Sequence, residues 1–329
     1  MIDTSVTRTF GIRYPVMSAP MSLHSGGGLA AAVTRAGGLG LFGATNPAGP
    51  DWLREQIRIA RDGCDGGPFG VGFITHLIPV FPELLDAALD EHVPVMAFSF
   101  ADPAPWTARA KDAGATVICQ VQTVAGAEQA VAAGADVLVA QGNEAGGHTG
   151  HANLMPLLLR LVRDHPDLPV LAAGGIASPG ALAAVLTAGA AGAWIGTALL
   201  ATPEAEHVSD AYKQRLIGAR SEDTRHTSVF DRLDEAAFGI PPWPDGIAGR
   251  AVVNALVEQW HGRERALAAQ LDRVLPDYRE ALASRDPSRT AVWAGESVDF
   301  VTRIRPVADV LRDICEGAER RLRAGATAD

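Results

Sequence analysis

Residues 136–151 read DVLVAQGNEAGGHTGH, an apolar run that opens into a glycine-rich loop around one histidine. The apolar part, residues 136–140, has the length and the branched side chains of a buried strand. The loop carries His148, a side chain whose charge changes near neutral pH. A strand that ends in such a loop is typical of the carboxyl end of an α/β barrel, where catalytic groups follow the strands.

The same unit, an apolar run, a loop and an alanine- and leucine-rich helical stretch, recurs along the first two thirds of the chain. Eight units at a spacing of roughly 20–35 residues predict an α/β protein with a (β/α)₈ TIM barrel. An open doubly wound sheet would have fewer strands and a dinucleotide fingerprint after the first strand, which the three glycines at 26–28 do not match. The expected strands are residues 15–19, 40–43, 69–74, 93–98, 116–121, 136–140, 170–173 and 192–195. The expected helices are residues 29–36, 51–60 (capped by Asp51), 82–90, 105–113, 125–133, 155–164 and 179–188.

The repeated unit of apolar run, loop and helical stretch is no longer found after residue 204, which indicates an addition to the barrel. We expect residues 1–204 and 301–329 to form the barrel, closed by a last helix over 307–322, and residues 205–300 to form a mainly helical insertion. The insertion would serve either as a lid over the barrel mouth or as a contact in a homodimer. Within it we expect a segment over 210–218, helices near 248–261 and 264–274, an extended stretch over 224–230, and core packing for Trp243 and Trp260.

Composition indicates a globular enzyme rather than a disordered or membrane chain. The 329 residues are 47% hydrophobic and 20% charged, with a formal net charge of −10. That charge argues against a general nucleic-acid surface, and no apolar run reaches the length of a membrane span. Cys64, Cys119 and Cys315 are too far apart for a metal site or a disulfide framework, and the first residues lack a secretory signal, so a cytoplasmic location is expected.

Two glycine loops follow the seventh and eighth strands, at Ala173-Gly174-Gly175 and at Gly196-Thr197. Glycines there expose backbone N–H groups, and barrels often bind a phosphate group at this position. The alternative is that the glycines only make tight turns. Two such loops on adjacent strands favour a phosphate site.

Other residues at strand ends are candidates for a flat ring and its substrate. Ala19, Pro20 and Met21 would border the face of a ring, and the Gln120 amide would both donate and accept at its edge. His148 is the candidate base, with Glu144 either orienting it or capping the loop. His24 and His151 are further candidates on the substrate side, and the alternative for His24 is an exposed loop position.

Taken together, Ala19-Pro20-Met21, Glu144 to Gly150, Ala172 to Ile176 and Ile195-Gly196-Thr197 resemble the FMN-dependent nitronate monooxygenase family, formerly called 2-nitropropane dioxygenases. The resemblance covers nearly the whole chain, including Ala36 to Gly40 early and Val292 to Val298, with Trp293, late. It implies a flavoprotein oxidoreductase that uses O₂ as a co-substrate, with His148 as the base toward the carbon beside a nitro group. It implies FMN as cofactor, no metal, and a cofactor site made of Ala19, Pro20, Met21, Gln120, Gly146, Gly147, Ala173, Gly174, Gly175, Gly196 and Thr197.

The chain departs from that family at three places. The third strand runs into Thr75-His76 without the asparagine often found there, Gln120 stands where some members have lysine, and the first loop contains His24. The same Glu144–His148 loop also resembles flavin enoyl-acyl-carrier-protein reductases. An NAD(P)H-dependent flavin reductase acting on an activated alkene is therefore the alternative, and a barrel that binds a phosphorylated metabolite without flavin is a third.

Overall fold

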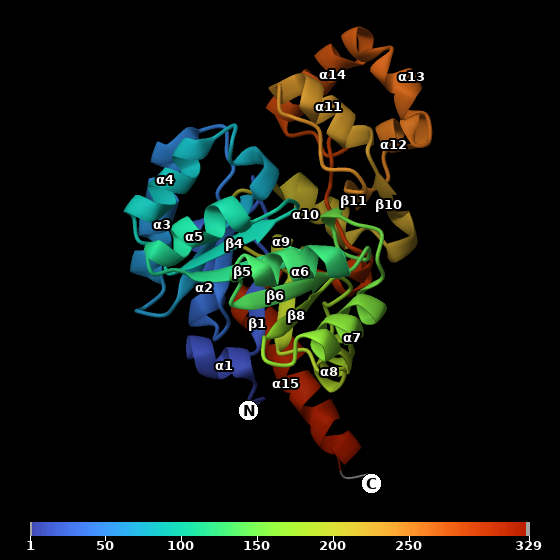
Figure 1. Ribbon diagram of the computed structural model, residues 1–329. Helices are drawn as coiled ribbons and strands as arrows, with labels where there is room; N and C mark the ends of the chain where they lie inside the picture. Colours follow the sequence, from blue (N-terminus) through green and yellow to red (C-terminus); the bar gives the residue numbers. More distant parts are fainter. Residues whose placement is uncertain (1, 327–329) are drawn as a thin grey trace.

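Eight parallel strands form a closed barrel in the computed structural model, which describes residues 2–326 (Figure 1). The hydrogen-bonded order is β1-β9-β8-β6-β5-β4-β3-β2, and a parallel bridge between Met17 and Leu39 joins the two ends. The predicted TIM barrel is confirmed, and each predicted strand lies within a few residues of an observed one. The barrel strands are β1 Val16–Ser18, β2 Gly40–Gly43, β3 Phe69–Ile74, β4 Val95–Ser99, β5 Thr116–Val121, β6 Val137–Gln141, β8 Val170–Ala173 and β9 Gly192–Ile195.

Helices surround the barrel between consecutive strands, as the repeated unit predicts. They are α2 Gly27–Arg35, α3 Gly49–Gly63, α4 Pro82–Asp90, α5 Ala104–Asp112, α6 Val124–Ala132, α7 Leu154–Asp164, α8 Pro179–Thr187 and the short α9 Thr197–Leu200. The last helix, α15 Val307–Ala326, packs against α8 and α2 and completes the ring. Asp51 is not the cap of its helix: α3 already begins at Gly49, with Pro50 in its first turn, where proline is tolerated.

Two hydrophobic layers hold the barrel together. Inward-facing side chains such as Met17, Leu41 and Trp194 fill its interior, and α1 (Ser5–Phe10) closes the amino-terminal end by adding Val6 to that cluster. The larger cluster lies between the strands and the surrounding helices. Because the interior is packed with side chains, the barrel is not a pore, and ligands are restricted to the carboxyl ends of the strands.

The insertion forms a second lobe with its own core, drawn in yellow to orange in Figure 1. Its helices are α10 Asp210–Ile217, α11 Val229–Phe238, α12 Ala255–Trp260, α13 Glu264–Ala268 and α14 Leu271–Ser284. Phe230, Leu233, Trp260 and Tyr278 are buried together there, so the expectation that Trp260 packs in a core is confirmed.

Three predictions for the insertion are partly wrong. The predicted helix 264–274 divides into α13 and the first turn of α14. The extended stretch expected over 224–230 ends at Thr227, and α11 begins at Val229. The stretch 248–261 divides into β11 (Ala248–Val252) and α12, because Asn254 caps the helix by accepting hydrogen bonds from Leu256 and Val257. β11 pairs antiparallel with β10 (Thr224–Thr227) on one side and with β7 (Gly147–Thr149) on the other. The mainly helical insertion therefore contains two strands that attach it to the loop carrying His148.

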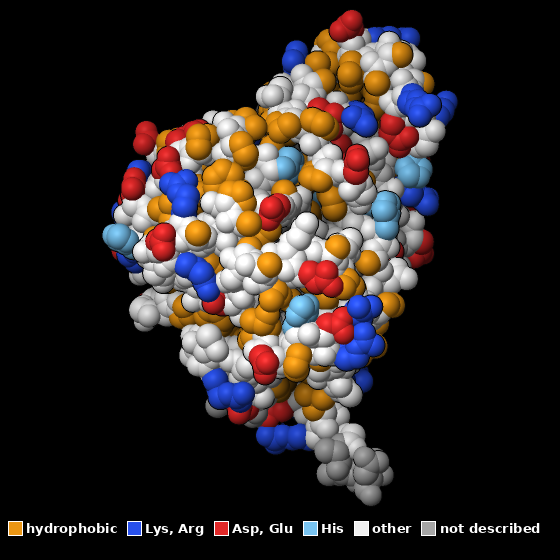
Figure 2. All heavy atoms as spheres, in the orientation of Figure 1, with side chains coloured by type: hydrophobic (Ala, Val, Ile, Leu, Met, Phe, Trp, Pro, Cys, Tyr) orange, Lys and Arg blue, Asp and Glu red, His pale blue; other side chains and the backbone are white. Residues whose placement is uncertain are grey.

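Among residues 2–326, no helix is both long enough and apolar enough to cross a membrane. On the face shown in Figure 2, hydrophobic side chains gather where the insertion lobe meets the barrel. The same junction holds the cavity described next.

Candidate active site

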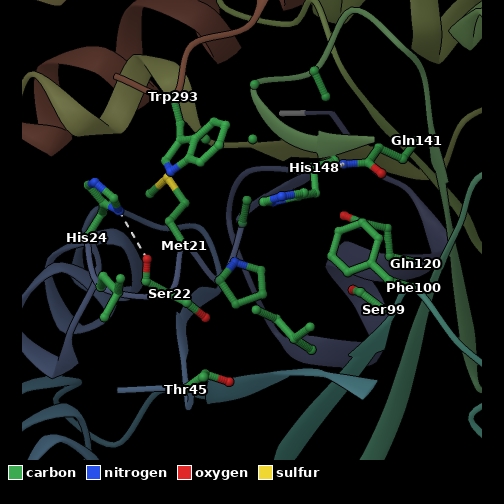
Figure 3. Close-up of a pocket in the computed structure, with 18 of the residues that line it drawn as sticks. Met21, Ser22, His24, Thr45, Ser99, Phe100, Gln120, Gln141, His148 and Trp293 are labelled. Atoms are coloured by element: carbon green, nitrogen blue, oxygen red, sulfur yellow. Dashed lines mark hydrogen bonds between the residues drawn. The ribbon is translucent and has the colours of Figure 1, made fainter. Parts of the chain in front are cut away.

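A cavity of about 550 Å³ lies at the carboxyl ends of the barrel strands and reaches under the insertion. Figure 3 shows His148 and Trp293 on one side of it, Met21 and Ser22 on another, and Gln120 and Phe100 facing them. Every predicted cofactor-binding residue lines this cavity, as do His148 and His24. The predicted residues along the wall are Ala19, Pro20, Met21, Gln120, Gly146, Gly147, Ala173, Gly174, Gly175, Gly196 and Thr197.

The two glycine loops form one end of the cavity. Gly174 and Gly175 have φ values of 111° and 70°, a region that side-chain-bearing residues rarely adopt. A Cβ at Gly175 would meet only the Glu144 side chain, at 3.8 Å, so the loop leaves space beside its backbone. The other loop begins α9 at Thr197 after Gly196, which has no side chain to cap the first turn. Exposed backbone N–H groups with open space beside them fit a phosphate group.

The first strand supplies an apolar edge to the same end. A Cβ at Gly196 would stand 3.4 Å from Met21 Sδ and 3.5 Å from Ala19 Cβ, in ordinary van der Waals contact. A Cβ at Gly72 on β3 would stand 2.3 Å from Pro20 Cγ, so glycine is required for Pro20 to lie where it does. Flat apolar surfaces beside a phosphate-type loop fit an aromatic ring that carries a phosphate tail.

His148 lies on β7 and is held by residues from the insertion. Its Nε2 lies 2.7 Å from Oδ1 of Asp231 on α11, and the Asp231 side chain is only 4% exposed. The Trp243 ring stacks on the imidazole with centroids 3.5 Å apart and an interplanar angle of 11°. Trp293 approaches from another direction at 5.1 Å. The ring of His148 is therefore fixed by one hydrogen bond and two aromatic neighbours.

A second pair of ionisable groups lies on the same helix. Asp234, one turn after Asp231, lines the cavity and accepts a hydrogen bond of 2.7 Å from the Tyr278 hydroxyl. Burial, together with the nearby Asp231 and Glu235 carboxylates, raises the pKa of Asp234 to about 7. The α11 helix thus presents to the site one carboxylate bonded to His148 and one carboxyl group that titrates near neutral pH.

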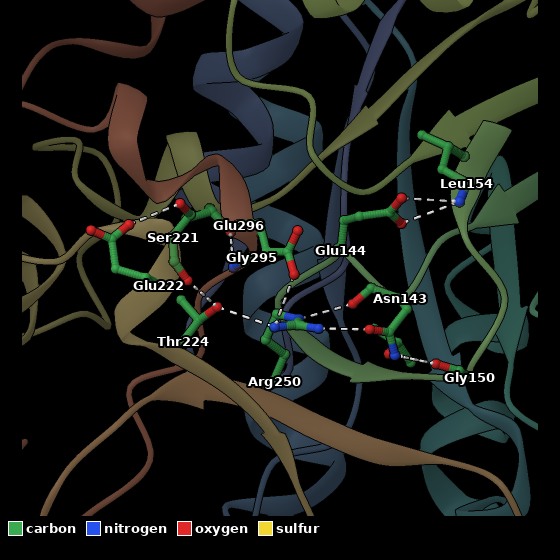
Figure 4. A network of polar contacts seen from close by, with 12 residues as sticks. Asn143, Glu144, Gly150, Leu154, Ser221, Glu222, Thr224, Arg250, Gly295 and Glu296 are labelled. Carbon is green, nitrogen blue, oxygen red and sulfur yellow. Dashed lines mark hydrogen bonds and ion pairs between the residues drawn. The ribbon is translucent and has the colours of Figure 1, made fainter.

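A buried arginine fastens the histidine loop to the insertion. Arg250 on β11 donates to the backbone oxygen and the side-chain Oδ1 of Asn143 and to Thr224 Oγ1, and it pairs with Glu296 (Figure 4). Asn143 in turn donates to the Gly150 carbonyl. Burial lowers the pKa of Arg250, but four partners satisfy its guanidinium. The network sets the position of the loop on either side of His148.

Glu144, which was expected either to orient His148 or to cap the loop, has a structural role. Both Glu144 carboxylate oxygens accept from Leu154 N at 3.2 Å, so Glu144 caps α7 and does not orient His148.

The two further histidines differ in position. His24 lines the cavity, with its ring 5.1 Å from Tyr212 and its Nδ1 bonded to the Ser22 carbonyl, and burial lowers its pKa. His151 is exposed, stacks edge-on against His226 and lies outside the cavity wall, so the structure does not support it as a substrate-side residue.

Several residues of the wall escaped the sequence analysis. Asp234, Trp243 and Trp293 line the wall, and Asp231 bonds to His148 without lining it. All four come from the insertion, more than 80 residues after His148 along the chain. Core packing was expected for Trp243, and this is wrong, because its ring lies over His148 in the cavity. The one signal available was the late stretch around Trp293, which belongs to the family resemblance. No spacing rule connects these positions to a loop so far away.

The strand ends of this barrel bring two phosphate-type glycine loops, an apolar edge and a half-buried histidine to one cavity. This arrangement is typical of a cofactor-using enzyme of the TIM-barrel class. A protein-family model described as nitronate monooxygenase matches residues 3–83 and 78–317. The chain therefore belongs to the nitronate monooxygenase family, which confirms the resemblance and identifies it as a monooxygenase-type oxidoreductase; the family is flavin-dependent.

The chain is similar over most of its length to one curated protein and to two solved structures. A nitronate monooxygenase, npaC, from Metarhizium robertsii is 31% identical and covers 91% of this chain and 89% of its own. Among solved structures, FabK from Thermotoga maritima superposes with a TM-score of 0.87 at 29% identity, over the full length of both chains. The nitroalkane oxidase from Streptomyces ansochromogenes superposes with a TM-score of 0.80 at 28% identity, covering 98% of this chain and 100% of that one.

Proposed function

We propose that the protein is an FMN-dependent nitronate monooxygenase that oxidises nitronates and nitroalkanes with O₂. The observation that carries the proposal is the shared cavity: His148 lines the same wall as the glycine loops that fit a phosphate tail. A bound FMN would then lie along the cavity with its ring within reach of the histidine. When bound, FMN supplies the redox chemistry between the substrate and O₂.

The glycine loops hold the cofactor in this proposal. The backbone N–H groups at Gly174, Gly175, Gly196 and Thr197 would receive the phosphate. The Thr197 hydroxyl accepts a hydrogen bond of 3.0 Å from Gly295 N, which leaves its own proton free to be donated to an anion. Ala19, Pro20 and Met21 would contact the ring, and Gln120 would form hydrogen bonds at its edge.

His148 acts on the substrate as the general base. A neutral nitroalkane must lose a proton from the carbon beside the nitro group, and the nitro group delocalises the electron pair that remains. A modest base is therefore sufficient, and imidazole in its neutral form is such a base near pH 7. A nitronate is already the anion, so it needs the cavity and the cofactor but not the proton transfer.

The aromatic side chains exclude water from this step. Trp243 covers one face of the imidazole, and Phe100 approaches both rings edge-on, at 6.5 Å from His148 and 5.2 Å from Trp243. A cavity closed in this way strengthens the electrostatic interactions inside it. The insertion then works as a lid over the mouth rather than as a dimer contact alone.

The second candidate function is an NAD(P)H-dependent flavin reductase acting on an activated alkene. The Glu144–His148 loop, which also resembles the loop of flavin enoyl-acyl-carrier-protein reductases, favours keeping it beside the first. Both candidates use the same cofactor site and the same histidine. They differ in what delivers electrons, a nitronate or a nicotinamide.

Two measurements test the proposal. Heat-released cofactor should co-elute with FMN, and O₂ consumption should follow the addition of an alkyl nitronate. A colourless protein with no flavin by absorbance would contradict the cofactor assignment. A yellow protein that consumes no O₂ with nitronates, yet oxidises NAD(P)H with an activated alkene, would replace the first function by the second.

A further inference from the structure

The carboxylate of Asp231 has the features of a functional group rather than a stabilising one. Its Oδ1 bonds to His148 Nε2 at 2.7 Å, while its Oδ2 is buried and has no hydrogen-bond partner among the described residues. A buried carboxylate with one unsatisfied oxygen costs free energy that a surface position would avoid. Helix α11 therefore holds Asp231 against the imidazole at a cost to stability, which points to a role in the site.

The contact has a consequence for the protonation pattern of the imidazole. An ionised carboxylate only accepts hydrogen bonds, so the nitrogen that faces it must carry the proton. The neutral ring then has Nε2–H bonded to Asp231 and a free lone pair on Nδ1. Among residues 2–326, no side chain or backbone group forms a hydrogen bond with Nδ1, and the ring lines the cavity.

We infer that Asp231 is a positioning residue that fixes His148 in the Nε2–H tautomer, so that Nδ1 is the atom that takes the proton from the substrate. This inference rests on the proposed function of His148 as the base. In the step itself the C–H bond beside the nitro group breaks, its proton goes to Nδ1, and its electron pair moves into the nitro group. The imidazolium that results keeps its Nε2–H on Asp231, whose negative charge stabilises it.

The surroundings of the ring favour this assignment over a random orientation. Stacking against Trp243, with the two planes 11° apart, prevents the ring from tilting.

The other ionisable groups near His148 and Asp231 are His76, Asp234 and Tyr278. His76 is kept neutral because burial lowers its pKa to about 4, so it does not compete for Asp231 as a cation. Asp234 is bonded to the Tyr278 hydroxyl, so neither of them bonds to the imidazole.

The base therefore has two parts from distant segments of the chain. β7 supplies the imidazole and α11, 83 residues later, supplies the carboxylate. Since β7 also pairs with β11, the insertion must be docked before the histidine is oriented.

The test compares Asp231→Asn with Glu280→Gln, which removes an exposed carboxylate on α14 of the same insertion. Both holoenzymes are assayed with nitroethane and with its nitronate. For Asp231→Asn we expect kcat/KM for the neutral nitroethane to fall on the order of 100-fold or more. The nitronate value should stay within about twofold, because no proton is removed. Glu280→Gln should leave both values unchanged.

A second readout does not depend on turnover. Nitrogen-15 NMR of histidine-labelled protein, with His148→Ala used to assign the signals, should show His148 with a protonated Nε2 and a bare Nδ1. In Asp231→Asn the protonated-Nδ1 form should appear. Equal losses on both substrates, no loss on either, or an unchanged tautomer in the variant would overturn the inference. A wild-type enzyme that turns over no nitronate, with the tautomer as expected, would instead sink the proposed function alone.

Discussion

The two sides of the cavity are built in different ways. The barrel side consists of short local motifs at strand ends, in which glycines bring backbone N–H groups to the wall. The insertion side consists of single side chains, Asp231, Trp243 and Trp293, that arrive from separate elements and meet around His148. The first side suits a phosphate and a ring, while the second suits control of one proton.

This difference predicts which substitutions should affect cofactor binding and which should affect the rate of the reaction. A change on the barrel side should release the cofactor, and the flavin-dependent activity should be lost with it. A change on the insertion side should leave the cofactor bound and alter the rate or its dependence on substrate. Single substitutions on each side of the cavity can test whether cofactor binding and reaction rate are separable.

Gly175→Asp should abolish FMN binding, because it places a carboxylate where the phosphate would lie. The matched control is Gly175→Asn, which has the same shape and the same strain at a φ of 70° without the charge. Flavin content after purification, measured by absorbance, should be near zero for aspartate and clearly higher for asparagine. Equal flavin content in the two variants would remove the phosphate from this loop.

His148→Ala should keep FMN while turnover of neutral nitroalkanes falls on the order of 100-fold or more, since general base catalysis contributes that much. Steady-state O₂ consumption at matched flavin content measures it, and nitronates should remain substrates. Full activity on a neutral nitroalkane would show that another group removes the proton. Loss of flavin would show that the two sides of the cavity are not separable at this residue.

Trp243→Ala should lower kcat for neutral nitroalkanes by about 2- to 12-fold, as expected when an aromatic contact of about 0.5–1.5 kcal/mol no longer holds the imidazole. Trp243→Phe retains a ring at the same place and should lose less. Flavin content should be normal in both. A loss in the phenylalanine variant as large as in the alanine variant would show that stacking on His148 is not the relevant contact.

The smallest effect is on stability, through Asp234. The pKa of this carboxyl is raised to about 7 in the folded protein and returns to its ordinary value near 4 on unfolding. Between these values the folded state binds more protons, so stability falls as pH rises from about 4 to about 7. Urea unfolding at pH 5 and pH 8 should show a decrease of roughly 1–3 kcal/mol from this group.

Asp234→Asn should remove that decrease and leave the variant more stable than the wild type at pH 8. Asp112→Asn, at an exposed position on α5, serves as the control and should keep the wild-type pH dependence. If Asp234→Asn also keeps the wild-type pH dependence of stability, another group is responsible for the decrease between pH 5 and pH 8.

The same contrast explains what could be read from the sequence. The strands β2, β3, β5, β8 and β9 were predicted with their observed bounds, because parallel buried strands are continuous apolar runs with glycine or polar ends. The position of the two glycine loops at the cavity followed from the strand ends, since a local motif carries its own geometry. Asp231 and Trp243 could not be found in this way, because their role depends on a sheet formed by β7, β10 and β11.

The region around β11 shows the physical reason. Its sequence has no strong alternation, and it is a strand because it has two partners, one of them the histidine loop itself. Gly249 permits the pairing by leaving room for Trp293, whose ring carbons would lie 2.2 Å from a Cβ there. Pairing between distant segments and close ring contacts of this kind do not appear in local propensity.

The central claim, an FMN site served by a histidine that acts on nitro compounds, is tested most directly by anaerobic mixing. The flavin absorbance of the purified holoenzyme should bleach on addition of an alkyl nitronate and should not bleach with NADPH or NADH over the same period. Rapid bleaching by NAD(P)H, with no change on addition of the nitronate, would contradict the account and identify the protein as a reductase.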